Sequence, residues 1–200
     1  MPAQSSVHFY LNWAKERLDE MDAALAVLDG QIAKMQADAR AKAQQFVAKL
    51  RAKRDEFDSS LKKQEQAGEA AWESAKARLE AEWKEFQHVL KEYTDTIGKH
   101  MEQQQAVFQS QVDAQLKAWR DTADQLNAAA KGFATESRRE VDAAIVRMKA
   151  DATAAEQKLA KLTQAGTETW SALSGALTET RASFDRANQA ARDAFKRAVG

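Results

Sequence analysis

Apolar residues recur along nearly the whole chain at alternating steps of three and four positions. In the first part of the sequence they form the series Leu11, Ala14, Leu18, Met21, Leu25, Leu28, Ile32 and Met35. Such spacing keeps one apolar face, called here the apolar seam, along a helix that packs against a partner helix. A four-four step at positions 35, 39 and 43 predicts a stutter, a local unwinding within one continuous helix. The pattern therefore predicts an all-α fold of long, coiled-coil-like amphipathic helices.

Helix ends are predicted at three places. Proline and serine in residues 2–6 favour a helix start, because proline is tolerated in the first turn and serine caps free N–H groups. Capping and β-branched residues before Gly98 predict a break there. Gly132 predicts a helix end, and Ser137 with Glu140 has the form of a capping box that starts the next helix.

The segment 61–86 recurs, without a gap, 98 positions later at 159–184. Eight of the 26 positions are identical. They are Leu61, Lys63, Gln66, Ala67, Gly68, Trp72, Leu79 and Phe86, matched by Leu159, Lys161, Gln164, Ala165, Gly166, Trp170, Leu177 and Phe184. A gapless match that includes a tryptophan and a glycine predicts an internal two-fold repeat of a helical unit.

The recurring residues are predicted to be structural. Trp72, Leu79 and Phe86, with Trp170, Leu177 and Phe184, continue the seam in the two copies. Gly68 and Gly166 have two readings. Each is a C-cap between two helices, or a small residue inside a helix where a neighbour passes closely, which the undisturbed apolar phase favours.

The breaks and the repeat together predict an antiparallel bundle rather than an extended parallel coiled coil. A single helix of this length would be roughly 300 Å long. Residues 1–97 are expected to form the first helical unit and residues 98–200 the second, packed together as one elongated bundle. Many seam positions are alanine, which buries little area, so dimerisation would help to cover them.

Composition narrows the class of protein. The 30 basic and 30 acidic side chains balance and are interspersed, whereas a nucleic-acid-binding surface needs a basic face. Cysteine is absent, and the longest apolar run, residues 23–28, is far too short to span a membrane. The first residues lack the basic and apolar regions of a secretory signal. We therefore expect a soluble, cytoplasmic protein that binds no nucleic acid.

No residue constellation predicts an enzyme, a cofactor or a metal site. Glu85 and His88 have the Glu-x-x-His spacing of di-iron bundles, but that site needs a second such pair, which the sequence lacks. A surface charge cluster of His88 with Glu85 and Glu92 is the expected role. The remaining carboxylates are expected to solvate helix surfaces and to pair with lysine or arginine.

Five tryptophans are many for so helical a chain. They are Trp13, Trp72, Trp83, Trp119 and Trp170. Most simply they fill the core at seam positions. The alternative is that they lie at a lipid or hydrophobic-granule surface, as aromatic residues of amphipathic helices do. The balanced charge of the polar face predicts only weak attraction to anionic lipid.

The repeated unit resembles the short coiled-coil stress-response proteins of bacteria. The resemblance rests on Ala67, Gly68, Trp72, Leu79 and Phe86, and again on Ala165, Gly166, Trp170, Leu177 and Phe184. Those proteins carry one such unit, whereas this chain carries two. A looser similarity links the chain to apolipoprotein-like and phasin-like amphipathic helix proteins. Neither resemblance supplies catalytic residues.

The expected function follows from these patterns. A near-unbroken seam without reactive groups predicts a non-enzymatic helical scaffold or interaction protein, and the resemblance adds a stress-related role. Its expected partner is another copy of itself, joined through the apolar seams, or another helical protein. The alternative is an amphipathic coat on a lipid or granule surface.

Overall fold

The computed structural model describes residues 8–199, and over that range the chain is helical without any strand. The six helices are α1 (Asn12–Ile32), α2 (Ala37–Ala67), α3 (Trp72–Thr96), α4 (Met101–Ala129), α5 (Thr135–Ala165) and α6 (Trp170–Val199). Short 3-10 turns, Phe9–Leu11, Glu69–Ala71 and Ala130–Gly132, precede α1 and α3 and follow α4. The all-α prediction is confirmed. The helix start predicted at residues 2–6 lies outside the described residues.

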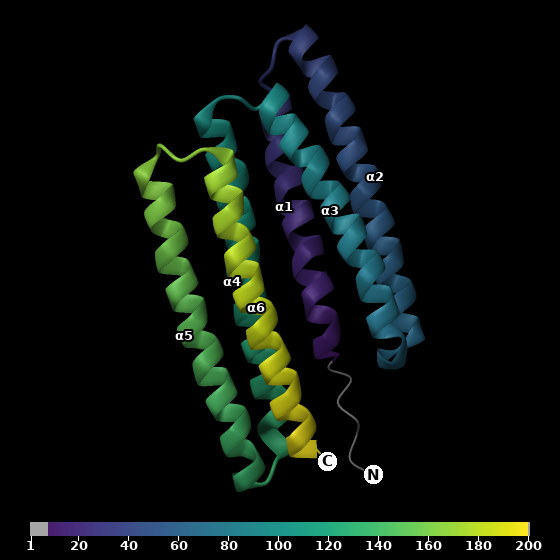
Figure 1. Cartoon of the computed structure of the whole chain (residues 1–200), viewed down its shortest axis with the longest axis vertical. Coiled ribbons are helices and arrows are strands. Elements are labelled where there is room, and N and C mark those ends of the chain that lie inside the picture. Colours follow the sequence, from purple (N-terminus) through teal and green to yellow (C-terminus); the bar gives the residue numbers. More distant parts are fainter. Residues whose placement is uncertain (1–7, 200) are drawn as a thin grey trace.

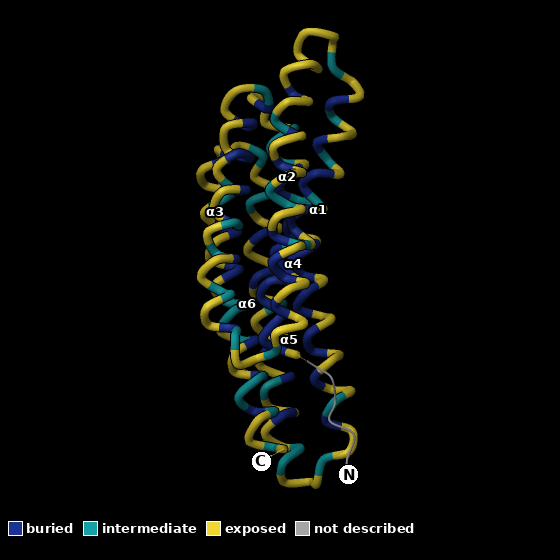
Figure 2. Tube along the Cα trace, turned by 90° about the vertical axis from the view of Figure 1, so that its right-hand side faces the viewer, coloured by how far each residue is buried: buried dark blue, intermediate teal, exposed yellow. Residues whose placement is uncertain are grey.

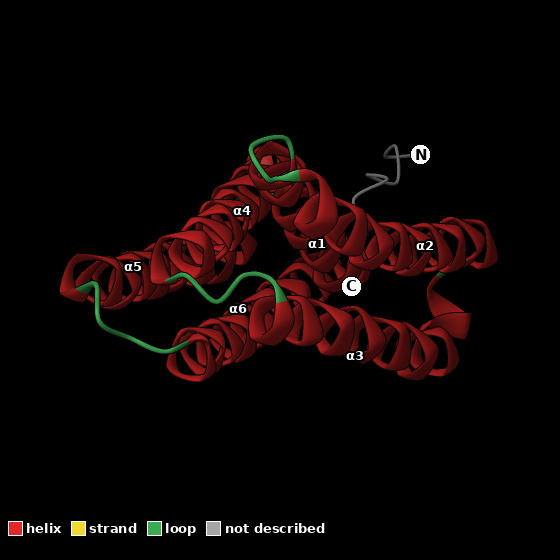
Figure 3. Ribbon diagram, turned by 90° about the horizontal axis from the view of Figure 1, so that it is seen from above, coloured by secondary structure: helices red, strands yellow, loops and turns green. Residues whose placement is uncertain are grey.

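The helices run up and down the long axis of the molecule, so that each is antiparallel to the next (Figure 1). α1, α2 and α3 form one group of three helices, and α4, α5 and α6 form another. The two groups meet where α1 packs along α4. Seen from the end, α1 and α4 are central, while α2 and α5 lie at opposite edges (Figure 3).

Buried and exposed residues alternate along each helix, and the buried ones lie mainly on the sides that face neighbouring helices (Figure 2). One apolar cluster joins residues of all six helices, with α5 contributing Leu159, so it crosses from one group of helices to the other. A second cluster is formed mainly by α4, α5 and α6. The large apolar side chains described as exposed are only Met101, Val146 and Val199. The predicted seams are therefore covered within the chain.

Helix boundaries in the two halves share the offset of the sequence match. α2 and α5 begin at Ala37 and Thr135 and end at Ala67 and Ala165, in both cases 98 positions apart. α3 and α6 begin at Trp72 and Trp170, again 98 positions apart. An origin of the two halves in one duplicated unit stays a prediction.

Both repeated glycines are turns, which decides between their two readings. Gly68 has a φ of +81° and Gly166 a φ of +67°, a region that side chains with a Cβ rarely adopt. The Gly68 N–H donates to the Gln64 carbonyl at 3.1 Å and so closes the last turn of α2. The apolar phase continues through each glycine because the following helix returns along the same core.

The predicted stutter is wrong, because the chain turns between Ile32 and Ala37. Met35 N–H donates to the Ile32 carbonyl at 3.1 Å, and the Arg40 guanidinium donates to the Met35 carbonyl at 2.7 Å. An arginine from α2 thus satisfies a carbonyl of the turn between α1 and α2. A four-four step in the seam occurs equally when a helix unwinds and when the chain reverses onto the same core.

The break at Gly98 is confirmed, but the capping box near Gly132 is wrong. α5 already begins at Thr135, after Ala134 in an extended conformation, so Ser137 and Glu140 lie inside the helix. Phe133 fixes the entry of the chain by packing against Phe195, with ring centroids 5.5 Å apart. Side-chain packing thus sets this helix start instead of a capping hydrogen bond.

Candidate interaction surface and buried ionic network

The seam residues singled out from the sequence are all buried. α3 contributes Trp72, Leu79 and Phe86, and α6 contributes Trp170, Leu177 and Phe184. The Trp72 ring packs against Tyr10 and Trp13, at centroid distances of 5.4 and 6.2 Å. Phe184 belongs to the second cluster, where its ring meets Trp119 at 5.3 Å, whereas the other five share the first cluster. These residues therefore build the core, and Gly68 and Gly166 lie apart from them at the helix ends.

Five charged side chains of α1 and α6 form a buried ionic network that was not predicted from the sequence. The Arg17 guanidinium donates to Glu16 at 2.5 Å and, through two nitrogens, to Asp185 at 2.9 and 2.8 Å. Arg181 donates to the Glu20 carboxylate from Nε at 3.0 Å and from Nη2 at 2.5 Å. Glu20 is 0% exposed and Glu16 1%, while Asp185 is half-buried. The network links the first helix of the chain to the last.

Burial sets the protonation of this network. Burial raises the pKa of Glu16 well above its ordinary value, although Arg17 opposes the shift. Burial alone would also raise the pKa of Glu20, but Arg181 and a hydrogen bond from Glu16 leave it lowered. A protonated Glu16 can donate a hydrogen bond to the Glu20 carboxylate, and Glu16 Oε1 has no hydrogen-bond partner among the described residues. With Glu16 protonated, the charges of Arg17 and Arg181 balance those of the Glu20 and Asp185 carboxylates.

Each buried arginine also lies against a tryptophan ring. The Arg17 guanidinium carbon lies 4.6 Å from the centroid of Trp13, and that of Arg181 lies 4.9 Å from Trp83. Cations over indole faces are attracted by the ring quadrupole, most strongly away from water. Arg181 therefore also joins α6 to α3.

Uncharged polar groups extend the network to α4. The Asn12 amide donates to Thr122 of α4 and to Asn188 of α6, each at 3.3 Å. The Thr180 hydroxyl of α6 donates to Gln115 of α4 at 2.5 Å. A slip of one helix along another would leave these buried groups unpaired, which is costly. The network therefore fixes the register of α1, α4 and α6.

Two features of the sequence could have revealed the network. In α1 a second series, Trp13, Arg17, Glu20 and Ala24, has steps of four, three and four and marks a helix buried on two faces. In α6, Arg181 occupies the seam step between Leu177 and Phe184 where the first half has Trp83. Charge at a seam position predicts a buried, partnered ion.

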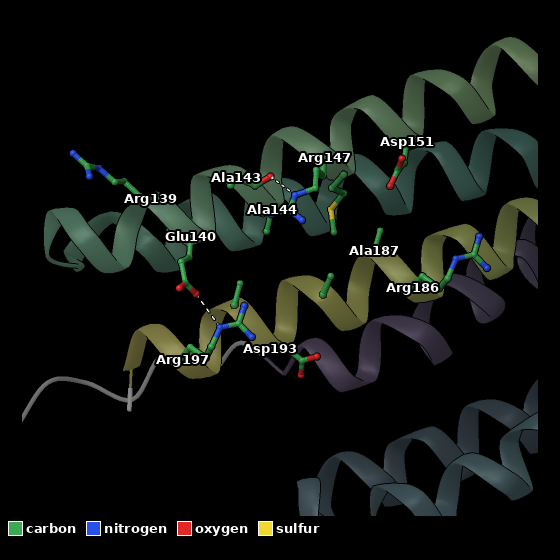
Figure 4. Close-up of a pocket in the computed structure, with 13 residues that line it drawn as sticks. Arg139, Glu140, Ala143, Ala144, Arg147, Asp151, Arg186, Ala187, Asp193 and Arg197 are labelled. Atoms are coloured by element: carbon green, nitrogen blue, oxygen red, sulfur yellow. Dashed lines mark hydrogen bonds and ion pairs between the residues drawn. The ribbon is translucent and has the colours of Figure 1, made fainter.

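An open groove of about 670 Å³ lies between α5 and α6 on the outside of the bundle (Figure 4). Five alanines line it, together with four arginines and three acidic residues. Glu140 of α5 accepts a hydrogen bond from Arg197 of α6 at 2.9 Å across one end. Further along, a groove of about 340 Å³ continues between the same helices, where Lys158 pairs with Glu179. Small side chains between charged rims form a surface that another helix can approach closely.

The sequence-predicted surface cluster around His88 is partly present. His88 Nε2 lies 3.5 Å from Glu92, on an exposed turn of α3, and Glu85 is exposed nearby in the sequence. Within residues 8–199, no group of three or more histidine, cysteine, aspartate or glutamate side chains is placed to hold a metal ion.

Comparisons with known proteins add no relative. The chain matches no protein-family model, no characterised protein and no solved structure. In the part of the chain that the structure describes, none of the helices is long and apolar enough to cross a membrane. The buried network and the α5–α6 groove are therefore the features of the molecule that bear on its function.

Proposed function

We propose that the protein is a non-catalytic helical scaffold that associates with another copy of itself. The apolar seams lie inside the bundle, so association would use the outer surface instead of the seams. The α5–α6 groove is the observation that carries the proposal. It combines small side chains, which permit close helix approach, with charges of both signs, which select a partner.

The buried contacts that fix the register of the helices support a scaffold. Polar groups of α1, α4 and α6 fix the register of the central helices, and buried tryptophans fill the core around them. Because the core fixes the register of the helices, the charged side chains on the surface keep a constant spacing. Fewer of these groups then have to be ordered when a partner binds. A stress-related role remains an expectation from the sequence resemblance alone.

Sedimentation velocity tests self-association directly. The expected result is a dimer of twice the 22.2 kDa chain mass, and the fraction of the protein in this dimer should increase with protein concentration. Surface ion pairs are screened by salt, so added salt should shift the distribution towards the monomer. If the protein is a monomer at every concentration at which it is soluble, the proposal is wrong.

Coating of a lipid or granule surface is the second candidate. It is favoured by the position of the aromatic side chains. All five tryptophans are buried, at 1% to 8% exposure, within amphipathic helices whose outer faces are polar. If the bundle opened, the inner faces of these helices would offer large aromatic side chains to an apolar surface.

Opening on a surface has a clear optical signature. Neutral liposomes or oil droplets should change the tryptophan emission and carry the protein with them in flotation. Anionic lipid should add little, because the charges are balanced. An unchanged emission spectrum together with no flotation would exclude this candidate.

A further inference from the structure

We propose that the chain forms a symmetric dimer in which α5 of one copy lies antiparallel along α5 of a second copy. This inference rests on the proposed self-association and assigns the surface and the register that it uses. The surface is a line of six residues on α5, called here the α5 stripe: Glu140, Ala144, Arg147, Asp151, Ala154 and Lys158.

The α5 stripe lies on one face of the helix and beside the groove. Its members follow one another at steps of four, three, four, three and four, the spacing that keeps residues in line along a helix. All six line the groove between α5 and α6, and only Ala144 is partly covered. The buried face of α5, formed by residues such as Val141, Ile145 and Met148, points elsewhere.

The charges of the α5 stripe are complementary to themselves when the helix direction is reversed. In an antiparallel pair centred on position 149, Glu140 faces Lys158 of the second copy and Arg147 faces Asp151. Ala144 faces Ala154, so a small residue meets a small residue. By symmetry every contact occurs twice, and no two like charges face each other. A self-complementary patch of this kind is what a two-fold interface requires.

The two central charges are available for such a contact. Within residues 8–199 neither Arg147 nor Asp151 takes part in an ion pair, and both are exposed. The outer charges already have partners on α6, because Glu140 pairs with Arg197 and Lys158 with Glu179. In the dimer each outer contact would extend these pairs into a row of four alternating charges. Specificity would come from the centre of the stripe.

Charge reversal at the centre tests the register by complementation. Arg147→Asp places two acidic groups opposite each other in a homodimer, and Asp151→Arg places two basic groups opposite each other. Each variant alone should therefore have a dimer dissociation constant at least about tenfold higher than wild type. Mixed in equal amounts, the two variants should form a heterodimer, because every acidic group then meets an arginine. Sedimentation velocity with one variant fluorescently labelled measures all three associations.

Lys149→Asp is the matched control, since it reverses a charge on the exposed side of α5 away from the stripe. It should leave dimerisation unchanged, and circular dichroism should show all three variants folded. If wild type dimerises but neither Arg147→Asp nor Asp151→Arg weakens the dimer, this inference fails while self-association stands. If wild type remains monomeric, both fail.

Cross-linking gives a second readout that does not depend on charge. The chain has no cysteine, so Ala144→Cys and Ala154→Cys each introduce a single thiol. A mixture of the two variants should form a disulfide-linked dimer much faster than either variant alone. In the proposed register position 144 of one copy lies opposite 154 of the other, whereas two 144 positions are about 15 Å apart. Equal cross-linking in all three samples would overturn the register.

Discussion

Glu16 shows how a single side chain can make the stability of a whole helix bundle depend on pH. Its carboxyl group is buried beside Glu20, and Arg17 alone does not compensate for the loss of water. The raised pKa favours the protonated form of this carboxyl group in the folded protein, and with Glu16 protonated the network is neutral. Ionisation would leave one buried negative charge in excess.

The first prediction concerns this proton. The pKa of Glu16 is higher in the folded than in the unfolded chain, so its stabilising contribution is complete below the unfolded pKa and is lost as pH rises through the folded value. The free energy of unfolding should fall in that window by up to about 1.4 kcal/mol per pH unit. Glu16→Gln, which can still donate to Glu20, should remove the slope.

Urea unfolding from about pH 5 to about pH 9 measures the slope of the unfolding free energy. Glu102→Gln, at an exposed position of α4, is the control and should keep the wild-type slope. The same slope in the Glu16→Gln variant would mean that Glu16 is ionised in the fold.

The second prediction concerns the pair of Arg181 and Glu20. Arg181→Met leaves the Glu20 carboxylate buried without its partner, and such a loss typically destabilises a protein by about 3–5 kcal/mol. The double variant Glu20→Met/Arg181→Met removes both charges and should recover most of that loss. Urea unfolding of the three proteins checks it. A double variant no more stable than Arg181→Met would show that the cation–π contact with Trp83 dominates.

At the scale of the helices, the apolar period predicted which faces are buried, but it does not by itself show where the chain turns. The phase continues through Gly68 and through residues 33–36, since α2 and α3 both pack back on the same core. A turn closed by the Arg40 side chain carries no glycine or proline that would reveal it. The turn at Gly98 was predictable because capping residues and a glycine occur together there.

The ionic network escaped prediction for a related reason. Sequence spacing shows one apolar seam per helix, whereas α1 is buried on two faces, by α2 on one side and by α4 and α6 on the other. Charged residues between seam positions normally face water. The second series in α1 and the charge at position 181 indicate buried ions, but only the arrangement of the helices shows that Glu20 faces Arg181.

The third prediction compares two glycines of opposite role. Gly68 has φ +81° and ψ 179°, a region essentially restricted to glycine, and the space that an added Cβ would occupy is open, so Gly68→Ala should cost about 1–3 kcal/mol through backbone strain alone. Gly30 lies inside α1, also with open space, and Gly30→Ala should stabilise by about 0.5–1 kcal/mol. Thermal unfolding of both variants should show a lower melting temperature for Gly68→Ala and a higher one for Gly30→Ala. A loss of stability in both would mean that Gly30 is needed for packing.

At the scale of the whole molecule, the packing of α1 on α4 joins the units predicted at residues 1–97 and 98–200. Each unit contains three helices, but the network around Glu20 is shared between them. A unit produced alone would therefore expose polar and apolar groups that are covered in the full chain.

The fourth prediction follows from this shared interface. Separate chains of residues 1–97 and 98–200 should be less helical than the whole protein and should combine one to one when mixed. Circular dichroism and isothermal titration calorimetry measure the two effects. Two fragments that are each fully helical and do not bind each other would show that the units are independent domains. Glu20→Met in the first fragment should weaken the recombination.

The two ends of the fold lie beside each other. The first described aromatic residue, Phe9, packs against Phe195 at 5.3 Å, and Asn188 donates to the Phe9 carbonyl at 2.9 Å. Because the two ends are neighbours, a short linker could join them, and the chain could then begin and end at another exposed turn. A circularly permuted chain with its ends joined by a short linker and new ends between Lys99 and His100 should reach the same fold, because that exposed turn leaves both groups of helices whole.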